Sequence, residues 1–365
     1  MKLSRIAVAV CFLALPLGAY AQSVTLYGVV DTGVEFVNHV GANGNGLVRM
    51  PNLSGTVPSR WGMRGSEDLG NGLKSVFVLE SGFAVDSGSS NQGGRLFGRQ
   101  AFVGLNSEWG QIAFGRQYSM LFWATLDTDI LGPNAYGSGS IDSYLPNARH
   151  DNAVTYKGKF GGFTVGATYS LGRDTVRANS ISGTNCAGEN PADVQACRAW
   201  SALLMYETAK WGAHVAYDSQ RGGADAFGGL TSSSLKDDRL SVGGYALLSN
   251  VKIGLGVINR NNEGSANSPG HSQLYYAGAS YDVTPAFNVA SEVFYVKFNN
   301  SPNKAWLGAV RGSYSFSKRT LAYATVGYID NHGTLALSAS NAAGGSAPAP
   351  GANQLGAMLG IKQIF

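Results

Sequence analysis

Apolar and polar residues alternate with a period of two along most of the chain. Near the N-terminus Val24, Leu26 and Phe36 share one face, while Asp31 and Glu35 lie on the other. Similar apolar rows recur at Phe163, Val165, Ala167, Tyr169 and Leu171, at Trp200, Ala202, Leu204 and Tyr206, at Val251, Ile253, Leu255 and Val257, and at Tyr275, Ala277, Ala279, Tyr281 and Val283. The period predicts β-strands with one apolar face, and no convincing helical period follows residue 21.

The connections between these strands alternate between short and long. Short turns are expected at 69–72, 107–110, 161–162, 210–212, 249–250, 284–285 and 317–318. Longer, mostly polar loops are expected at 39–57, 86–94, 120–150, 172–198, 220–237, 262–272, 299–303 and 331–353. Antiparallel hairpins with tight turns at one end and loops at the other give this pattern. Seven short turns and eight long loops predict sixteen strands, with both termini on the short-turn side.

Two architectures accommodate sixteen such strands. A soluble sandwich or propeller buries the apolar faces against another sheet. A transmembrane barrel turns them to lipid and lines a water-filled lumen with the polar faces. Charged residues fall in mid-strand on the polar faces, at Arg64, Lys157, Glu207, Lys252, Arg311 and Lys362. A lipid-facing Arg or Lys costs about 2–4 kcal/mol at mid-membrane, so these charges fix the register of a barrel. In a sandwich they would face solvent.

The last segment favours the barrel. Leu355, Leu359, Ile361 and Phe365 share one phase in a strand that ends with the chain. A closed barrel pairs its last strand with its first and leaves no edge. Aromatic residues near predicted strand ends suit interfacial girdles, although ordinary β-propensity also explains them: Tyr27, Trp109, Phe160, Trp211, Phe287 and Trp306.

The first residues predict export. Lys2 and Arg5 precede an uncharged run at 6–17, and residues 19–21 read Ala-Tyr-Ala, as in a signal-peptide cleavage site. We therefore expect a signal peptide at 1–21 and one barrel domain at 22–365. The run is too short to span a bilayer as a helix, and no later stretch reaches the length of a transmembrane helix.

Composition agrees with this class. Charged residues make up 14% of the chain, and it contains 50 glycines. Without the two basic residues of the leader, the balance of 27 basic against 23 acidic residues becomes 25 against 23. So small an excess gives no reason to expect nucleic acid as a partner.

Two cysteines remain after the leader and its Cys11 are removed. Cys186 and Cys197 lie in a polar stretch of an exported chain, so we expect a disulfide that closes a loop. Two cysteines and five scattered histidines make a poor metal site. We predict no metal and no cofactor.

Several motifs resemble those of a known family. They are "SVTLYGVVDTGVEF", "SRWGMRGSEDLGNGLKSVFVLESGF", "RQAFVGLNSEWGQIAFGRQ" and the ending "LGIKQIF". They are similar to the Gram-negative general porins, in particular the trimeric sixteen-stranded porins of beta-proteobacteria. The resemblance implies a homotrimer in the outer membrane, with periplasmic termini and with lipid and lipopolysaccharide around it. It implies small hydrophilic solutes and ions as cargo, and Phe365 as the signal for the barrel-assembly machinery. Gln363 and Ile364 depart from the family ending, which often has a basic residue or histidine there.

The resemblance also implies a pore constriction. In such porins the third long loop folds into the lumen and faces arginines on the wall. That loop is 120–150 here, and its acidic residues are Asp127, Asp129 and Asp142. The matching arginines are Arg60, Arg99, Arg116 and Arg149, with Arg64 on the face of Arg60. This excess of arginine suggests mild anion preference, because fixed positive charge in a narrow aqueous gap attracts anions.

Strict alternation conflicts with two of these arginines. Arg99 shares its phase with Val103, and Arg116 shares its phase with Phe114, so both would point outward. A bulge near Gly98 or Gly115 would turn them inward. Otherwise they would lie in a trimer contact or at the rim.

Other functions have weaker support. A barrel lipase needs a serine, a histidine and an orienting partner at the rim, and no such motif is present, so we predict no enzyme. A surface adhesin would use the long loops at 172–198 and 331–353. A substrate-selective channel, with saturable flux, is the main alternative to a general porin.

Overall fold

Antiparallel strands form almost all of the molecule. The computed structural model describes residues 23–53, 55–173, 186, 188–224, 226–265 and 270–365. The expected signal peptide, 1–21, lies outside the described residues. The first strands are β1 (Ser23–Val40), β2 (Asn45–Arg49), β3 (Arg60–Gly70), β4 (Leu73–Gly82), β5 (Gln100–Ser107), β6 (Gly110–Tyr118), β7 (Arg149–Phe160) and β8 (Phe163–Ser170). The rest are β9 (Ala199–Glu207), β10 (Trp211–Arg221), β11 (Lys236–Leu248), β12 (Val251–Asn262), β13 (His271–Asp282), β14 (Phe287–Phe298), β15 (Lys304–Ser315), β16 (Thr320–His332) and β17 (Asn353–Ile364).

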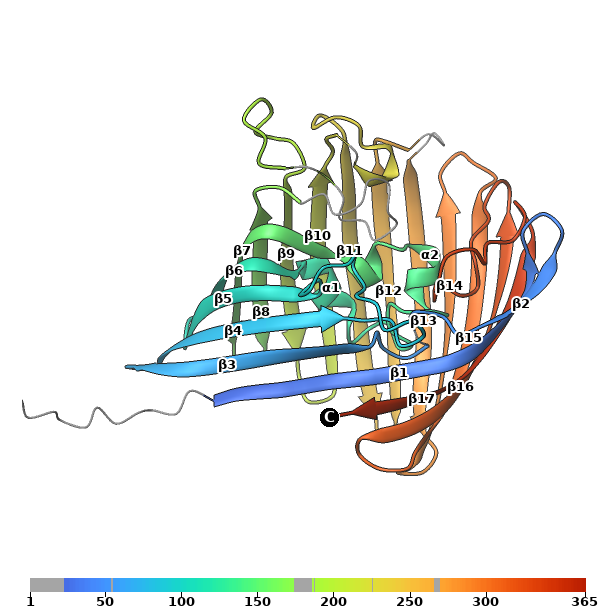
Figure 1. Cartoon of the computed structure of the whole chain (residues 1–365), viewed down its shortest axis with the longest axis horizontal. Coiled ribbons are helices and arrows are strands. Elements are labelled where there is room, and N and C mark those ends of the chain that lie inside the picture. Colours follow the sequence, from blue (N-terminus) through green and yellow to red (C-terminus); the bar gives the residue numbers. More distant parts are fainter. Residues whose placement is uncertain (1–22, 54, 174–185, 187, 225, 266–269) are drawn as a thin grey trace, which may run out of the picture.

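The sheet closes on itself. From β3 onward each strand pairs with the next along the chain, and β1 pairs with β17, from Val29 opposite Ile364 to Val37 opposite Gly356. On its other side β1 pairs with β3 near its start and with the short β2 near its end. β2 and β3 therefore share one position in the wall, and the barrel has the sixteen predicted positions (Figure 1).

The exposed and buried faces distinguish the two architectures. Trp200 and Leu204 are 44% and 47% exposed on the outside. Lys252 and Arg311 lie on the other face and reach segments of the loop after β6: Lys252 bonds to Asp127, and Arg311 to the carbonyl of Leu131. Apolar side chains therefore ring the outside and charged ones face inward, which excludes the soluble sandwich. Among the described residues, no helix has the length and apolar character needed to cross a bilayer.

Outward aromatic rings lie at two levels of the wall. Trp200 packs on Tyr217 at the long-loop ends, with ring centroids 4.9 Å apart. Tyr206 packs on Trp211 at the short-turn ends, 5.5 Å apart. The six residue steps from Trp200 to Tyr206 span about 20 Å along a tilted strand, so the two rings lie toward opposite edges of the apolar band of an outer-membrane barrel. Tyr27 does not belong to a girdle, since its hydroxyl donates to Glu80 on the inner face.

A disulfide stabilises the loop between β8 and β9. Cys186 and Cys197 are bonded, as predicted, with their Cα atoms 5.4 Å apart. Both are buried with Ala196, Ala226 and Leu230, so they join this loop to the one between β10 and β11, which contains the short 3-10 helix η2 (Phe227–Gly229).

Candidate functional site: the constriction of the lumen

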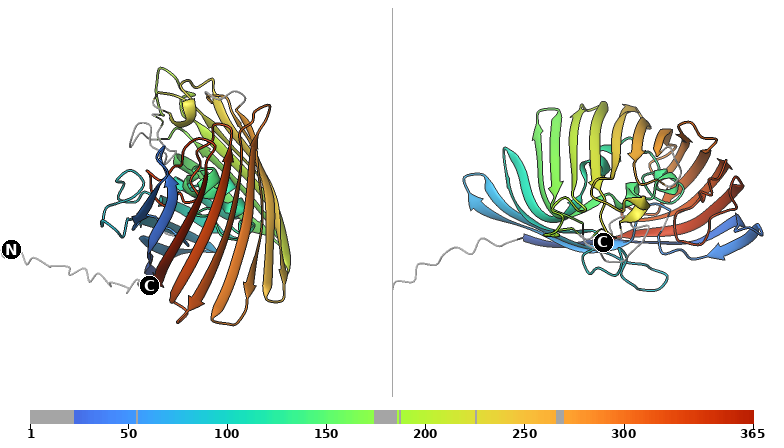
Figure 2. Two further views of the ribbon diagram at one scale, coloured as in Figure 1. Left: turned by 90° about the vertical axis from the view of Figure 1, so that its right-hand side faces the viewer. Right: turned by 90° about the horizontal axis from the view of Figure 1, so that it is seen from above.

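The loop between β6 and β7, residues 119–148, lies inside the barrel. It contains α1 (Met120–Thr125), α2 (Ser138–Ile141) and the 3-10 helix η1 (Leu145–Asn147). Seen from above, these helices lie within the curve of the wall (Figure 2). The loop is as expected from the sequence, except that it ends at Ala148 and Arg149 already begins β7. Its helix α1 lies against β8 to β11, and α2 lies against β14.

Hydrogen bonds hold the loop against the wall. The Ser119 side chain caps α1, and the Met120 N–H donates to Ser201 Oγ at 2.9 Å. Further along, the Leu131 N–H donates to Glu292 at 2.7 Å, and the Tyr136 hydroxyl donates to Glu35 at 2.8 Å. These bonds connect the loop to distant strands on several sides, so its position is fixed by the closed barrel.

The three loop aspartates bond to the wall and to the loop itself. Lys252 Nζ lies 2.8 Å from Asp127, and Arg239 Nε lies 2.9 Å from Asp142. Asp129 is buried, accepts from Ser138 Oγ at 2.6 Å and has Glu292 beside it. The ion pairs of Asp127 and Asp142 thus differ from the expected arrangement, in which the loop aspartates face the arginine cluster.

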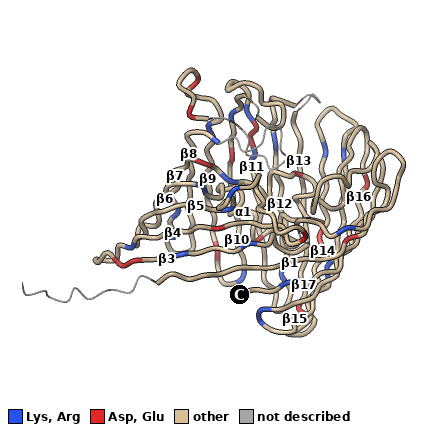
Figure 3. Tube along the Cα trace, in the orientation of Figure 1, with Lys and Arg blue, Asp and Glu red and all other residues tan. Residues whose placement is uncertain are grey.

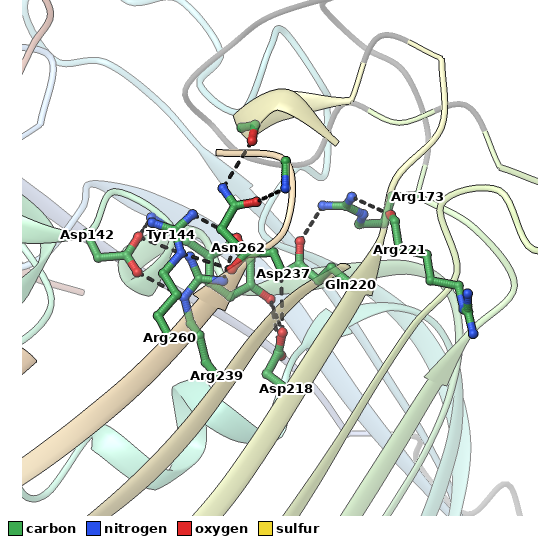
Figure 4. Close-up of polar contacts among 12 residues, drawn as sticks. Asp142, Tyr144, Arg173, Asp218, Gln220, Arg221, Asp237, Arg239, Arg260 and Asn262 are labelled. Atoms are coloured by element: carbon green, nitrogen blue, oxygen red, sulfur yellow. Dashed lines mark hydrogen bonds and ion pairs between the residues drawn. The ribbon is translucent and has the colours of Figure 1, made fainter. Parts of the chain in front are cut away.

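Burial and charge act differently on two of these carboxyls. Burial raises the pKa of Asp129 above the usual range of an aspartate. Burial also acts to raise the pKa of Asp142, but the charges of Arg239 and Arg260 outweigh it and hold that pKa well below its usual range. Figure 4 shows Asp142 among these arginines, with Asp237 and Tyr144 nearby. Asp142 is therefore a permanently charged anchor of the loop.

Opposite the loop, Glu80 holds two of the predicted arginines. Arg99 Nε donates to Glu80 Oε1 at 2.7 Å, and Arg60 Nε lies 3.7 Å from Oε2. Tyr27 donates to the same carboxylate at 3.0 Å. Arg99 precedes β5 in an irregular segment, so strand alternation does not extend to it and its side chain turns inward. The outward orientation implied by its phase is wrong.

A bulge turns Arg116 inward. The pairing of β6 with β7 shifts between Gly115 and Gln117, and Gly115 has a φ of 124°, which favours glycine. Arg116 is buried and donates to Asp151 Oδ1 at 2.6 Å. The bulge expected near Gly115 is therefore present, and it points the Arg116 side chain toward the lumen.

Arg95, which no sequence motif indicated, completes this group. Its guanidinium binds Asp151 through two nitrogens, at 3.1 and 3.2 Å. Glu80 was also missed, although the chain contained a signal for it. The hairpin that turns at Asn71 places Glu80 opposite Gly62. Glu80 is then the diagonal neighbour of Arg60 on the inner face.

Tyr118 joins the remaining arginine to the cluster. Its hydroxyl accepts from Arg99 Nη2 at 2.5 Å and from Arg149 Nη2 at 2.8 Å. Its ring stacks on Phe122 of α1, with centroids 3.9 Å apart. Tyr118 therefore connects the arginines of the wall to the loop, a role that no sequence motif indicated.

Arg64 lies apart from the others. It is exposed, and its guanidinium lies 5.5 Å from the Tyr27 ring. It is four residues nearer the short-turn side than Arg60. Together, Arg60, Arg95, Arg99, Arg116 and Arg149 form the arginine cluster. Among the described residues, Glu80 and Asp151 are the carboxylates that form ion pairs with it, so five positive charges meet two negative ones there.

Two cavities flank the loop. One, of about 430 Å³, opens on the long-loop side, and among its described lining residues only Arg99 and Arg149 are charged. The loop side of this cavity presents amides, including Asn134 and Asn147. The second, of about 540 Å³, lies on the short-turn side below α1, where Lys157 Nζ lies 3.8 Å from the Trp123 ring centroid. In Figure 3 basic positions gather near α1, while much of the strand length carries no charge.

Comparisons with known proteins agree with this geometry. The family model described as "Gram-negative porin" matches residues 7–334. An outer membrane porin protein of Bordetella pertussis is 38% identical over 212 residues, which are 54% of each chain. Outer membrane porin protein 32 of Delftia acidovorans is 31% identical, and the match covers 100% of both chains.

Solved structures show the same architecture. An anion-selective porin from Comamonas acidovorans superposes with a TM-score of 0.77 at 25% identity, over 94% of this chain and 100% of that one. The trimer form of OmpT from Vibrio cholerae has a TM-score of 0.66 at 17% identity, over 94% of this chain and 100% of that chain. At that identity the second likeness concerns the fold alone.

Proposed function

The chain belongs to the Gram-negative porins, a family of outer-membrane channel proteins and not of enzymes, and we propose that its lumen prefers anions. The solutes that cross are small, hydrophilic and driven by their own gradient. The observation that carries the preference is the excess of three positive charges in the arginine cluster beside a loop whose aspartates bond elsewhere.

The physical basis is the field in a narrow gap. Two cluster arginines face amides across the 430 Å³ cavity, so an anion there meets donors and no opposing carboxylate from the described lining. Low-dielectric walls make this field stronger than in bulk water. Arginine keeps its charge at every physiological pH, so the preference does not depend on pH through these groups.

The test is a planar-bilayer recording of the purified protein across a potassium chloride gradient. We expect the reversal potential to shift toward the chloride equilibrium potential. The conductance should rise nearly linearly with salt concentration. A reversal potential shifted toward the potassium equilibrium potential would overturn the anion preference. A conductance that saturates would instead support the substrate-selective channel.

We also propose a homotrimer, the assembly that membership of the porin family and the likeness to the sixteen-stranded porins of beta-proteobacteria imply. Phe365 would serve the assembly machinery, and it also closes the barrel, because its N–H and carbonyl bond to Gly28 at 3.1 Å. Native mass spectrometry gives the mass of the assembly directly. Channel closure in three equal steps would indicate three open pores, and a single step with a monomeric mass would exclude the trimer.

A further inference from the structure

A basic cavity lies on the outer surface of the barrel, at the long-loop ends of β8 to β11. It has a volume of about 180 Å³ and is lined by Arg198, Arg221, Lys236, Tyr169, Trp200 and Ser219, among others. Arg221 pairs with Lys236 across β10 and β11. The Arg221 N–H donates to the Arg198 carbonyl at 2.8 Å. Three adjacent strand ends therefore bring three cations together.

The three cations face away from the lumen. Figure 4 shows the Arg221 side chain turned away from the inner group of Asp142, Tyr144 and Arg239. Arg198 Nη1 donates at 2.5 Å to the hydroxyl of Tyr169, whose ring is 43% exposed on the outside. The cavity is therefore separate from the constriction and is reached from the membrane side of the wall.

The described part of the chain leaves these cations without matching anions in the cavity. Arg221 Nη1 donates to the Ser233 carbonyl at 2.9 Å, and Arg198 Nε is buried without a partner among the described residues. Glu263 accepts from the backbone N–H of Lys236 at 2.9 Å but does not line the cavity. Like charges on directly paired strand positions repel, so an anion from outside would stabilise this arrangement.

The depth of the cavity points to a lipid headgroup. Trp200 lines the cavity and belongs to the outward aromatic level at the long-loop ends, with Tyr217. Aromatic girdles mark the boundary between hydrocarbon and headgroups. Leu204, on the same outward face, is 47% exposed nearer the hydrocarbon centre. A molecule with a phosphate group and acyl chains could place the phosphate in the basic cavity and the acyl chains against the apolar face at Leu204.

We propose that this cavity binds a phosphate group of a phosphorylated glycolipid in the outer leaflet. The inference rests on the position of the barrel in the outer membrane. Guanidinium groups bind phosphate oxygens through paired, charge-assisted hydrogen bonds, and the ammonium group of Lys236 adds a point charge. A lipid is favoured over free phosphate because the cavity opens beside the apolar face of the wall and not into the aqueous lumen.

The experiment measures binding of diphosphoryl lipid A and of its dephosphorylated form to the folded protein in detergent, by native mass spectrometry. The double variant Arg221→Gln, Lys236→Gln removes two cations, each worth about 1 kcal/mol near an anionic surface, so affinity for the diphosphoryl form should fall about 30-fold. The control Lys210→Gln, Lys318→Gln removes the same charge from exposed positions at the short-turn rim and should bind as wild type does.

The outcomes separate this inference from the channel function. Equal binding of both lipids by the wild-type protein would overturn the proposal without reference to any variant, as would an unchanged affinity in the double variant. Binding of inorganic phosphate alone as tight as that of the lipid would assign the cavity to the free ion and overturn the lipid assignment. Conductance and reversal potential of the double variant should equal those of the wild type, because the cavity lies outside the lumen.

Discussion

The guanidinium of Arg149 lies 4.4 Å from the centroid of the Tyr118 ring and also donates to the Tyr118 hydroxyl, at 2.8 Å. Arg99 donates to the same hydroxyl at 2.5 Å. One tyrosine therefore positions both arginines that line the long-loop cavity. Its own position depends on stacking with Phe122, so the loop and the basic wall are mechanically connected.

Tyr118→Phe should weaken this arrangement. It removes the acceptor shared by two charged donors, and a hydrogen bond to a charged group contributes about 1.5–3 kcal/mol. We expect a lower thermal midpoint and a smaller chloride-to-potassium permeability ratio. Tyr328→Phe is the control, because that ring is 47% exposed on the outside. Identical reversal potentials for Tyr118→Phe and wild type would show that Tyr118 does not position the arginines.

Arg60→Ala should lower the chloride-to-potassium permeability ratio, whereas Arg64→Ala should change it less. Arg60 lies beside Glu80 in the cluster, and Arg64 lies four residues further along β3, about 13 Å away. The Debye length is about 10 Å at 0.1 M salt, so the charge of Arg64 is largely screened from the cluster. Reversal potentials of both variants at this ionic strength provide the measurement. An unchanged value for Arg60→Ala would remove Arg60 from the selectivity mechanism.

Asp142→Asn should destabilise the protein at neutral pH and lose this effect in acid. Breaking a buried pair costs about 3–5 kcal/mol, although Arg239 keeps a second partner in Asp237, 3.0 Å away. The pKa of Asp142 is lowered in the folded state, so its contribution is complete above the unfolded pKa of about 4 and is lost progressively as pH falls from that value through the lower folded pKa.

Circular dichroism melts at pH 7 and pH 3 test this dependence. The difference between wild type and Asp142→Asn should shrink in acid. Asp127→Asn is a matched control, since its pair with Lys252 is half-exposed and contributes at most about 1 kcal/mol. A constant difference across this pH range would contradict the assignment of Asp142 as the charged anchor.

Gly115→Ala should disrupt the bulge that orients Arg116. A Cβ at this position would lie 2.2 Å from the Ala101 carbonyl oxygen, and the positive φ adds about 1–3 kcal/mol of strain. We expect a lower melting temperature and a reduced anion preference. Gly308→Ala is the control, because nothing lies within 4 Å of a Cβ there. If both variants had the same melting temperature and both kept the ion selectivity of the wild type, the bulge would not set the position of Arg116.

Local periodicity was sufficient for much of the fold. Alternation of side chains is a property of every extended backbone, so rows such as Trp200, Leu204 and Tyr206 could be assigned to one face without a structure. The order of short and long connections then predicted sixteen wall positions. Cys186 and Cys197 could be paired because cysteines close together in an exported chain form a disulfide in an oxidising compartment.

The sequence by itself determined the strands, their faces and the identity of most cluster arginines. The tertiary structure decided that Asp151 meets two of them, because the irregular segment before β5 brings Arg95, and the bulge at Gly115 brings Arg116, to that carboxylate. It also decided the orientation of Arg99 and Arg116, since an irregular approach to β5 and a bulge at Gly115 interrupt the period. A period of two describes a regular strand, and the constriction is built where the strands are irregular.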